Sequence, residues 1–193
     1  MKKIICIVSI LFCLVPFCVF AESSEPVSFR YNLTFDSTLD DIIAAEGAEP
    51  TFSFGGYVLY QDVKTAGKTS QVLYVMDGDV IGMCSIFIQE KHSEPQTYTF
   101  DYNAIDEILI EKYGTPDSPK DVKWFDDLYM NEPHKLGFAV SCGDALVTTR
   151  WDLDGLGITH ALQGDNYEIT HIITYTPASL EEYNSPQLTD HGL

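Results

Sequence analysis

The chain has 193 residues, of which 29 are acidic and 11 are lysine or arginine, and its formal net charge is −18. This length is enough for one domain with a sizeable hydrophobic core. So negative a protein repels nucleic acid and anionic lipid, which excludes nucleic-acid binding as the expected function. The charge favours solubility and cationic partners.

The first 21 residues have the pattern of a cleavable signal peptide. Two lysines precede an apolar run, 4–20, in which Ser9 is the one polar residue, and the chain turns polar directly after Ala21. We expect cleavage between Ala21 and Glu22, which places the mature protein in the periplasm or outside the cell. Loss of the two lysines changes the formal net charge from −18 to −20. The alternatives are an uncleaved anchor or a lipid on Cys18.

A short helix is predicted at 38–46. Ser37 can cap its first turn, and Gly47 supplies a left-handed stop. Three strands follow as an antiparallel meander, at 56–63, 70–76 and 79–89. Asp77-Gly78 is a strong hairpin signal between the second and third of these strands, because both positions tolerate positive φ.

A second helix is predicted at 102–113, where Ile105, Ile108 and Leu109 form one apolar face. Five further strands are predicted, at 121–126, 136–142, 145–153, 157–163 and 167–175. Gly164-Asp165-Asn166 is a good turn between the last two strands. The second half of the chain therefore repeats the order of the first, a helix followed by strands.

The two predicted helices also have similar sequences. Residues 38–43 align with 104–109 at an offset of 66, and Pro50 matches Pro116 at the same offset. A diverged duplication explains this, and coincidence between two capped helices is the alternative. The predicted fold is α+β, with two short helices on one face of a long antiparallel sheet. The expected organisation is a signal peptide at 1–21, one domain at 22–183 with candidate halves at 29–92 and 97–176, a helical turn at 178–183, and a flexible tail at 184–193.

Parts of this pattern resemble small exported bacterial proteins of unknown function. The similar stretches are 29–47, Trp124 with 127–129, Trp151, and 162–166. More distantly, the tandem layout is similar to the β-lactamase inhibitor protein and to small outer-membrane assembly lipoproteins. The resemblance implies a helix-plus-sheet binding protein rather than an enzyme. The non-lipidated signal departs from the lipoproteins.

Two cysteines and two histidines are the candidates for covalent or metal chemistry. Cys84 and Cys142 remain after signal cleavage, and in an exported protein they can pair as a disulfide or remain as buried thiols. His160 and His171 flank the turn between the last two strands, so we expect them to be near cross-strand neighbours. They are weak metal candidates, since two histidines make half a site. No cofactor is expected.

Aromatic residues concentrate in the second half of the chain. Strand aromatics usually pack in a core, whereas aromatics on an exposed sheet face would bind a partner. Trp124, Tyr129 and Trp151 are the candidates for such a surface. We expect a non-enzymatic binding protein whose partner is a protein or an envelope component. The alternatives are a secreted hydrolase with a site assembled from distant residues and a metal or small-ligand carrier. No catalytic residue is assigned, because no nucleophile, metalloprotease or phosphate-loop motif is present.

Overall fold

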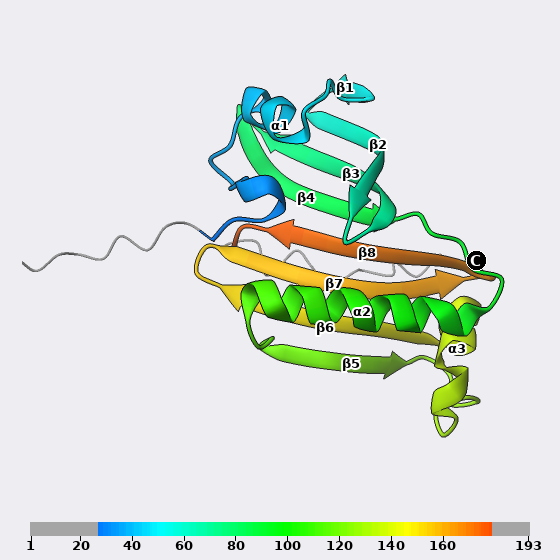
Figure 1. The fold of residues 1–193 in the computed structure, drawn as a ribbon. Helices are drawn as coiled ribbons and strands as arrows, with labels where there is room; N and C mark the ends of the chain where they lie inside the picture. Colours follow the sequence, from blue (N-terminus) through cyan, green and yellow to red (C-terminus); the bar gives the residue numbers. More distant parts are fainter. Residues whose placement is uncertain (1–26, 179–193) are drawn as a thin grey trace, which may run out of the picture.

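The computed structural model describes residues 27–178 (Figure 1). The predicted signal peptide at 1–21, its cleavage site after Ala21 and the tail at 184–193 lie outside the described residues. So does nearly all of the helical turn predicted at 178–183. Within 27–178, no helix is both long and apolar enough to cross a membrane.

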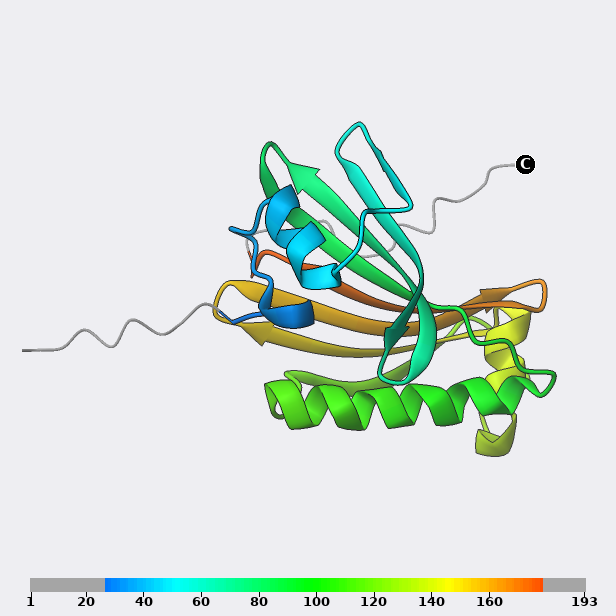
Figure 2. The ribbon, with the colours of Figure 1, turned by 45° about the horizontal axis from the view of Figure 1, so that its top comes forward.

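One eight-stranded antiparallel sheet dominates the structure, in the order β1-β2-β3-β4-β8-β7-β6-β5. This confirms the α+β class and the long antiparallel sheet. The strands are β1 (Phe52–Phe54), β2 (Tyr57–Thr65), β3 (Lys68–Asp77), β4 (Val80–Ile88), β5 (Ser118–Trp124), β6 (Ala145–Leu153), β7 (Leu156–Asp165) and β8 (Glu168–Thr176). Figures 1 and 2 show that the sheet twists strongly, so that β1 to β4 stand at an angle to β5 to β8.

The strand order is mirrored about the centre of the sheet. Strands β1 to β4 and β5 to β8 each follow in sequence from an edge to the centre, where β4 and β8 pair. Strands β2, β3 and β4 begin at 57, 68 and 80, and β6, β7 and β8 begin 88 residues later, at 145, 156 and 168. This constant spacing is what a duplication would leave, and duplication remains a hypothesis.

Helix α1 (Leu39–Glu46) forms where the sequence predicts it, but its cap lies one residue later. The Thr38 hydroxyl accepts a hydrogen bond from the Asp41 amide, and the Asp41 carboxylate accepts from the Thr38 amide. Ser37 instead accepts from the Thr34 amide at 3.0 Å. This reciprocal capping box fixes the first turn, and Gly47 at φ 71° ends the helix as predicted.

Helix α2 (Pro95–Tyr113) is not short, as it begins seven residues before the predicted start. Pro95 suits a first helical position because its φ is fixed and its missing N–H is not needed there. A third helix, α3 (Leu136–Cys142), replaces the strand predicted at 136–142. Short 3-10 turns, η1 (Arg30–Asn32) and η2 (Pro133–Lys135), complete the elements.

The close packing of α3 on α2 explains why 136–142 is helical. Gly137 lies so near the start of α2 that an added Cβ would be 2.4 Å from the Pro95 carbonyl oxygen. The Gly137 amide donates to the side chain of Gln96 at 3.0 Å. This tertiary contact overrides the strand-like composition of the segment, and Gly143 at φ 88° ends the helix.

The helices cover one face of the sheet (Figure 2), and the core lies between that face and the helices. A large cluster joins Ile42 of α1, Ile105 and Leu109 of α2, and the inward side chains of both halves of the sheet. A smaller cluster under α2 and α3 includes Tyr102, Val140 and the start of β6. Both predicted helices therefore pack on the same sheet face.

Candidate functional site

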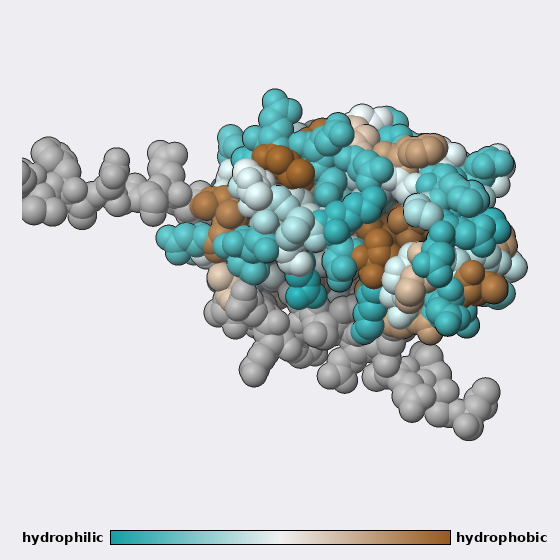
Figure 3. Space-filling model, turned by 90° about the horizontal axis from the view of Figure 1, so that it is seen from below, coloured by the Kyte–Doolittle hydropathy of each residue, from teal (hydrophilic) through white to brown (hydrophobic). Residues whose placement is uncertain are grey.

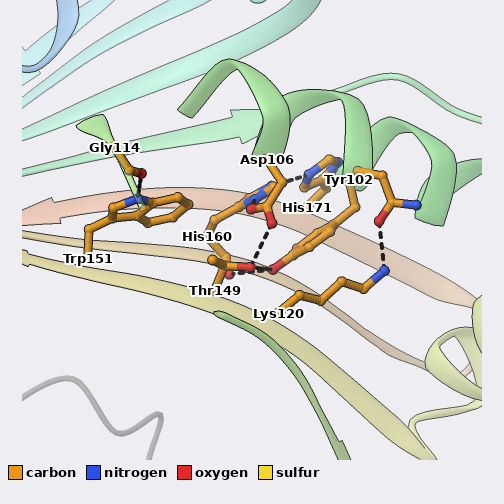
Figure 4. Close-up of polar contacts among 9 residues, drawn as sticks. Tyr102, Asp106, Gly114, Lys120, Thr149, Trp151, His160 and His171 are labelled. Carbon is orange, nitrogen blue, oxygen red and sulfur yellow. Dashed lines mark hydrogen bonds and ion pairs between the residues drawn. The ribbon is translucent and has the colours of Figure 1, made fainter. Parts of the chain in front are cut away.

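The most unusual feature of the core is a set of polar side chains beneath α2. Asp106 and Tyr102 point from one face of α2 toward the sheet, because positions four residues apart share a helix face. Thr149, His160 and His171 point up at them from β6, β7 and β8 (Figure 4). All five residues are buried.

These side chains form a continuous hydrogen-bonded relay. Nδ1 of His160 lies 2.8 Å from Oδ1 of Asp106, and Nε2 of His160 lies 2.8 Å from Nε2 of His171. The Thr149 hydroxyl donates to the other carboxylate oxygen of Asp106 at 3.0 Å. We call Asp106, His160 and His171 the Asp–His–His relay. Both oxygens of its carboxylate are thus occupied.

Tyr102 closes the relay from one side. Its ring stacks on His160 with centroids 3.9 Å apart and planes 5° from parallel. Its hydroxyl lies 2.8 Å from that of Thr149 and 3.1 Å from the His160 carbonyl oxygen. Because the Thr149 proton goes to Asp106 and a carbonyl oxygen only accepts, the single proton of the Tyr102 hydroxyl is shared between the Thr149 hydroxyl and the His160 carbonyl oxygen.

The hydrogen bonds also fix the tautomers of the two histidines. Burial lowers the pKa of His160. Burial, together with the repulsion that two protonated rings would feel, lowers the pKa of His171 to about 3, so both rings are neutral at pH 7. His160 donates from Nδ1 to the Asp106 carboxylate, which leaves its Nε2 as an acceptor. His171 must then donate from Nε2, and its Nδ1 carries a lone pair.

A second polar cluster lies one turn earlier on α2, nearer the surface. Asp101 accepts from Lys68 at 2.6 Å and contacts His92 Nε2 at 2.7 Å. Burial raises the pKa of Asp101, but the hydrogen bonds from Lys68 and His92 outweigh it and lower the pKa overall. The His92 ring packs edge-on against Tyr98, with centroids 4.8 Å apart.

The relay is expected to stabilise the fold. Asp106→Ala leaves the buried His160 N–H and the Thr149 hydroxyl without an acceptor, so we expect a loss of about 2–3 kcal/mol in the free energy of unfolding. Asp106→Asn keeps an acceptor oxygen and should cost less than half as much. Urea unfolding at pH 7 measures both. Glu107→Ala, on the exposed side of α2, is the control and should stay within about 0.5 kcal/mol of wild type. Equal losses for Asp106→Ala and Glu107→Ala would rule out this role.

The predicted pair His160 and His171 does meet across adjacent strands. Its facing nitrogens are 2.8 Å apart, which is a hydrogen-bond distance. Two nitrogens that each bind zinc at about 2.0–2.1 Å in tetrahedral geometry would lie more than 3 Å apart. Among the described residues, no group of three or more histidine, cysteine, aspartate or glutamate side chains is arranged so that it could hold a metal ion.

The three predicted aromatic binding residues have different environments. Trp151 is fully buried in the large core cluster, where its indole N–H donates to the Gly114 carbonyl at 2.9 Å. This corrects its assignment to an exposed face, because its side chain points inward from β6. Trp124 and Tyr129 are half-buried and pack against the smaller cluster. Tyr129 also contacts the exposed Phe138 ring.

The disulfide considered between Cys84 and Cys142 is not formed, and both are free thiols. Cys84 lies inside the large cluster on β4, where burial raises the pKa of its thiol. Cys142 ends α3 beside the smaller cluster. The two cysteines therefore belong to different parts of the core.

The acidic members of the site were missed from the sequence. With a helix starting at 102, Asp106 falls within the first two turns, where an exposed acid is ordinary. With the true start at Pro95 it lies in mid-helix, one residue from the buried Ile105. The helical spacing of the apolar residues could have identified both acids. Asp101 and Asp106 fall on the same buried face of α2 as Tyr102, Ile105 and Leu109.

Comparison with known proteins adds little to this geometry. No protein-family model matches the chain, and no curated protein matches it. A solved structure, that of a DUF4309 family protein (YjgB) from Bacillus subtilis subsp. subtilis str. 168, is similar at a TM-score of 0.40 and 14% sequence identity. The match covers 76% of this chain and 82% of that one. At this TM-score the likeness carries no argument about function.

Proposed function

We propose that this protein is an exported, non-enzymatic binding protein that engages a basic segment of a protein partner. The observation that supports the proposal is a cluster of exposed or half-exposed aromatic and apolar side chains at one end of the sheet. We call this cluster the aromatic end. Its members come from the loop before η2, from α3 and from the β7–β8 turn: Phe125, Leu128, Tyr129, Met130, Phe138 and Tyr167.

The aromatic end includes a chain of rings in contact. The Tyr129 and Phe138 centroids are 5.4 Å apart, and the Phe138 and Tyr167 centroids are 6.2 Å apart. The Tyr167 amide donates to the Ser141 carbonyl at 2.8 Å, which holds the β7–β8 turn against α3. Tyr167 is 68% exposed and Leu128 is 65% exposed. Figure 3 shows apolar side chains among hydrophilic ones on the underside of the molecule. Clustered apolar exposure of this kind is typical of interaction surfaces.

The charge around the aromatic end favours a cationic partner. Residues 123–144 and 163–170 contain six carboxylates and two lysines. Lys135 is paired with Glu132 at 2.8 Å, and Lys123 lies 5.2 Å from the centre of the Phe125 ring. Aromatic faces with surrounding carboxylates suit lysine and arginine side chains. A pocket of about 680 Å³ beside Phe125 carries Asp165 and Glu168 in its lining.

The hydrolase alternative has less support. The two hydroxyls within the relay network, those of Thr149 and Tyr102, are both fully buried, and both already donate hydrogen bonds. Export rests on the signal-peptide pattern of residues 1–21, which lie outside the described part of the chain. The resemblance to exported binding proteins is consistent with this function and remains a prediction.

The test is binding of the protein to an array of synthetic peptides with lysine and arginine at varied spacing, followed by titration calorimetry of the best binder. We expect Phe138→Ala and Tyr167→Ala each to weaken binding about tenfold, because each removes an exposed ring from the surface. Binding should also weaken as salt rises from 0.05 to 0.5 M, with both values chosen to bracket physiological screening at about 0.15 M.

Phe54→Ala is the matched control. Phe54 is 77% exposed on β1, at the opposite edge of the sheet from β5, so its removal should leave binding unchanged. The proposal fails if acidic peptides bind as well as basic ones, or if Phe54→Ala weakens binding as much as Tyr167→Ala does.

A further inference from the structure

A second, smaller pocket lies where β4 leaves the sheet, beside the start of α2. Its volume is about 380 Å³, enough for one extended side chain. It is lined by the segment after β4, by Tyr98 and by the end of the β7–β8 hairpin, and the buried relay reaches it through His171. His171 is only 3% exposed.

His171 contributes an acceptor to this pocket. Its Nε2 is bonded to His160, so Nδ1 is its remaining polar ring atom. Within residues 27–178, no side chain or backbone group forms a hydrogen bond with Nδ1. The Asp106 carboxylate sets the direction of the hydrogen bonds in the Asp–His–His relay because it can only accept. His160 therefore donates to Asp106, and His171 donates to His160. Nδ1 of His171 therefore carries a lone pair, and His171 is one of the residues that line the pocket.

The rest of the lining favours a positive donor. Glu90 and Glu168 supply two carboxylates, and Tyr98 and Tyr167 supply aromatic rings. The Thr69 amide donates to Glu90 at 2.7 Å, and this hydrogen bond lowers the pKa of the Glu90 carboxyl, which is thus charged at neutral pH. Lys91 is the one lysine in the lining.

We propose that this pocket binds the ammonium group of a lysine side chain, with Nδ1 of His171 as its innermost acceptor and Glu168 at its mouth. An ammonium has three donors and no acceptor, so it matches a lone pair, carboxylates and aromatic faces. A guanidinium is planar and needs a wider, bidentate partner. This inference rests on the proposed function, because Tyr167 belongs both to the pocket and to the aromatic end.

The first test follows the imidazole nitrogens of the 15N-labelled protein by NMR at pH 7. We expect His160 to be protonated at Nδ1 and His171 at Nε2. Adding Nα-acetyl-lysine N-methylamide should shift the His171 Nδ1 resonance, and the norleucine analogue, which lacks the ammonium, should not. Cadaverine distinguishes the source of the ammonium, since a shift with cadaverine alone points to a free amine and overturns the lysine assignment. A protonated Nδ1 on His171 in the free protein would also overturn the proposal.

The second test uses variants in which a carboxylate is replaced by the amide of the same size, and which leave the relay intact. Glu168→Gln should weaken acetyl-lysine amide binding at least threefold. Asp165→Asn removes a carboxylate that is also exposed on the same hairpin but lies outside this pocket, so it should change binding less than about 1.5-fold. Equal effects of the two variants on binding would overturn the assignment of this pocket as the ammonium site.

The peptide experiment separates this inference from the proposed function. If peptides bind at the aromatic end but substitution of their lysines by arginine leaves affinity unchanged, the lysine pocket is wrong and the binding function stands. If no basic peptide binds while acetyl-lysine amide still shifts His171, the pocket stands and the proposed function is wrong.

Discussion

Acidification from pH 7.5 to pH 4.5 is expected to destabilise the protein through its two buried histidines. The expected loss is about 3 kcal/mol for His171, whose pKa lies at about 3 against about 6.5 in an unfolded chain. His160, whose pKa is also lowered, adds to this loss. Urea unfolding at several pH values between 7.5 and 4.5 measures the effect.

The direction follows from the surroundings of each ring. Burial is the main cause of the lowered pKa of His171; the charges of His160, Lys68 and His92 lower it further, and only Asp101 opposes them. Around His160, burial and Lys120 outweigh the hydrogen bond and charge of Asp106. Below pH 6.5 these two histidines bind protons in the unfolded chain but remain unprotonated in the folded protein. Stability is therefore complete above pH 6.5 and falls as the pH drops toward the folded pKa.

Histidine variants isolate this contribution from the general titration of the acidic surface. His171→Gln removes the depressed pKa, so the variant's stability should depend less steeply on pH, by about 1.4 kcal/mol per pH unit below pH 6.5. His134→Gln replaces an exposed histidine, with 74% of its side chain accessible, and should leave the slope unchanged. Parallel stability curves for wild type and His171→Gln would contradict the depressed pKa.

Loss of the ion pair between Arg30 and Glu46 is expected to cost about 3–5 kcal/mol. The pair lies in the first half of the molecule, where η1 meets the end of α1. Arg30 Nε and Nη2 donate to the two Glu46 oxygens at 2.6 and 2.9 Å, and Tyr74 donates to Glu46 at 2.6 Å. The two side chains are 6% and 2% exposed. Burial acts to lower the pKa of Arg30, but the hydrogen bond and charge of Glu46 outweigh it, and the pKa is raised overall.

The cost arises because each partner is left as an uncompensated buried charge. Arg30→Met strands the Glu46 carboxylate, and Glu46→Leu strands the guanidinium and the Tyr74 hydroxyl. The double variant removes both charges, so it should be less destabilised than the sum of the two single variants. Urea unfolding of all four proteins gives the coupling energy.

Tyr60→Phe is a useful companion measurement. The Tyr60 hydroxyl lies fully buried and has no hydrogen-bond partner within 27–178. Its removal should change stability by less than about 0.5 kcal/mol or increase it, because no hydrogen bond is lost. If Tyr60→Phe lowers the free energy of unfolding as much as Arg30→Met does, the destabilisation by Arg30→Met reflects packing rather than charge.

Most strands could be predicted from the sequence because glycine and asparagine turns mark their ends. The strand predicted at 145–153 coincides with β6, and β2, β3, β4, β7 and β8 agree with their predicted bounds within two residues. Strand β5 begins three residues before the predicted 121–126, and the short edge strand β1 was not predicted. The strand predicted at 136–142 was wrong, because the helix found there depends on the contact of Gly137 with α2 rather than on local preference. The extra turns of α2 were missed because 95–101 lacks an apolar period.

The candidate site was only half predictable. The turn predicted at 164–166 forms slightly later, at Asn166-Tyr167, since Asp165 already pairs with Glu168. A hairpin turn near this position brings His160 and His171 close together, so their closeness follows from the sequence. The link to Asp106 depends on how α2 rotates over the sheet, which no local pattern specifies. Trp151 looked like a surface candidate because strand alternation alone does not say which face is buried.

The pairing of β4 with β8 at the centre of the sheet has a consequence for how the chain folds. Cys84 lies opposite Tyr175, a partner about 90 residues away, and β8 is the last strand of the sheet. Each meander closes through short loops, which form quickly, whereas the central seam must wait until the end of the chain is available. Until then β4 exposes an unpaired apolar edge, and that nascent intermediate is the species most prone to aggregate.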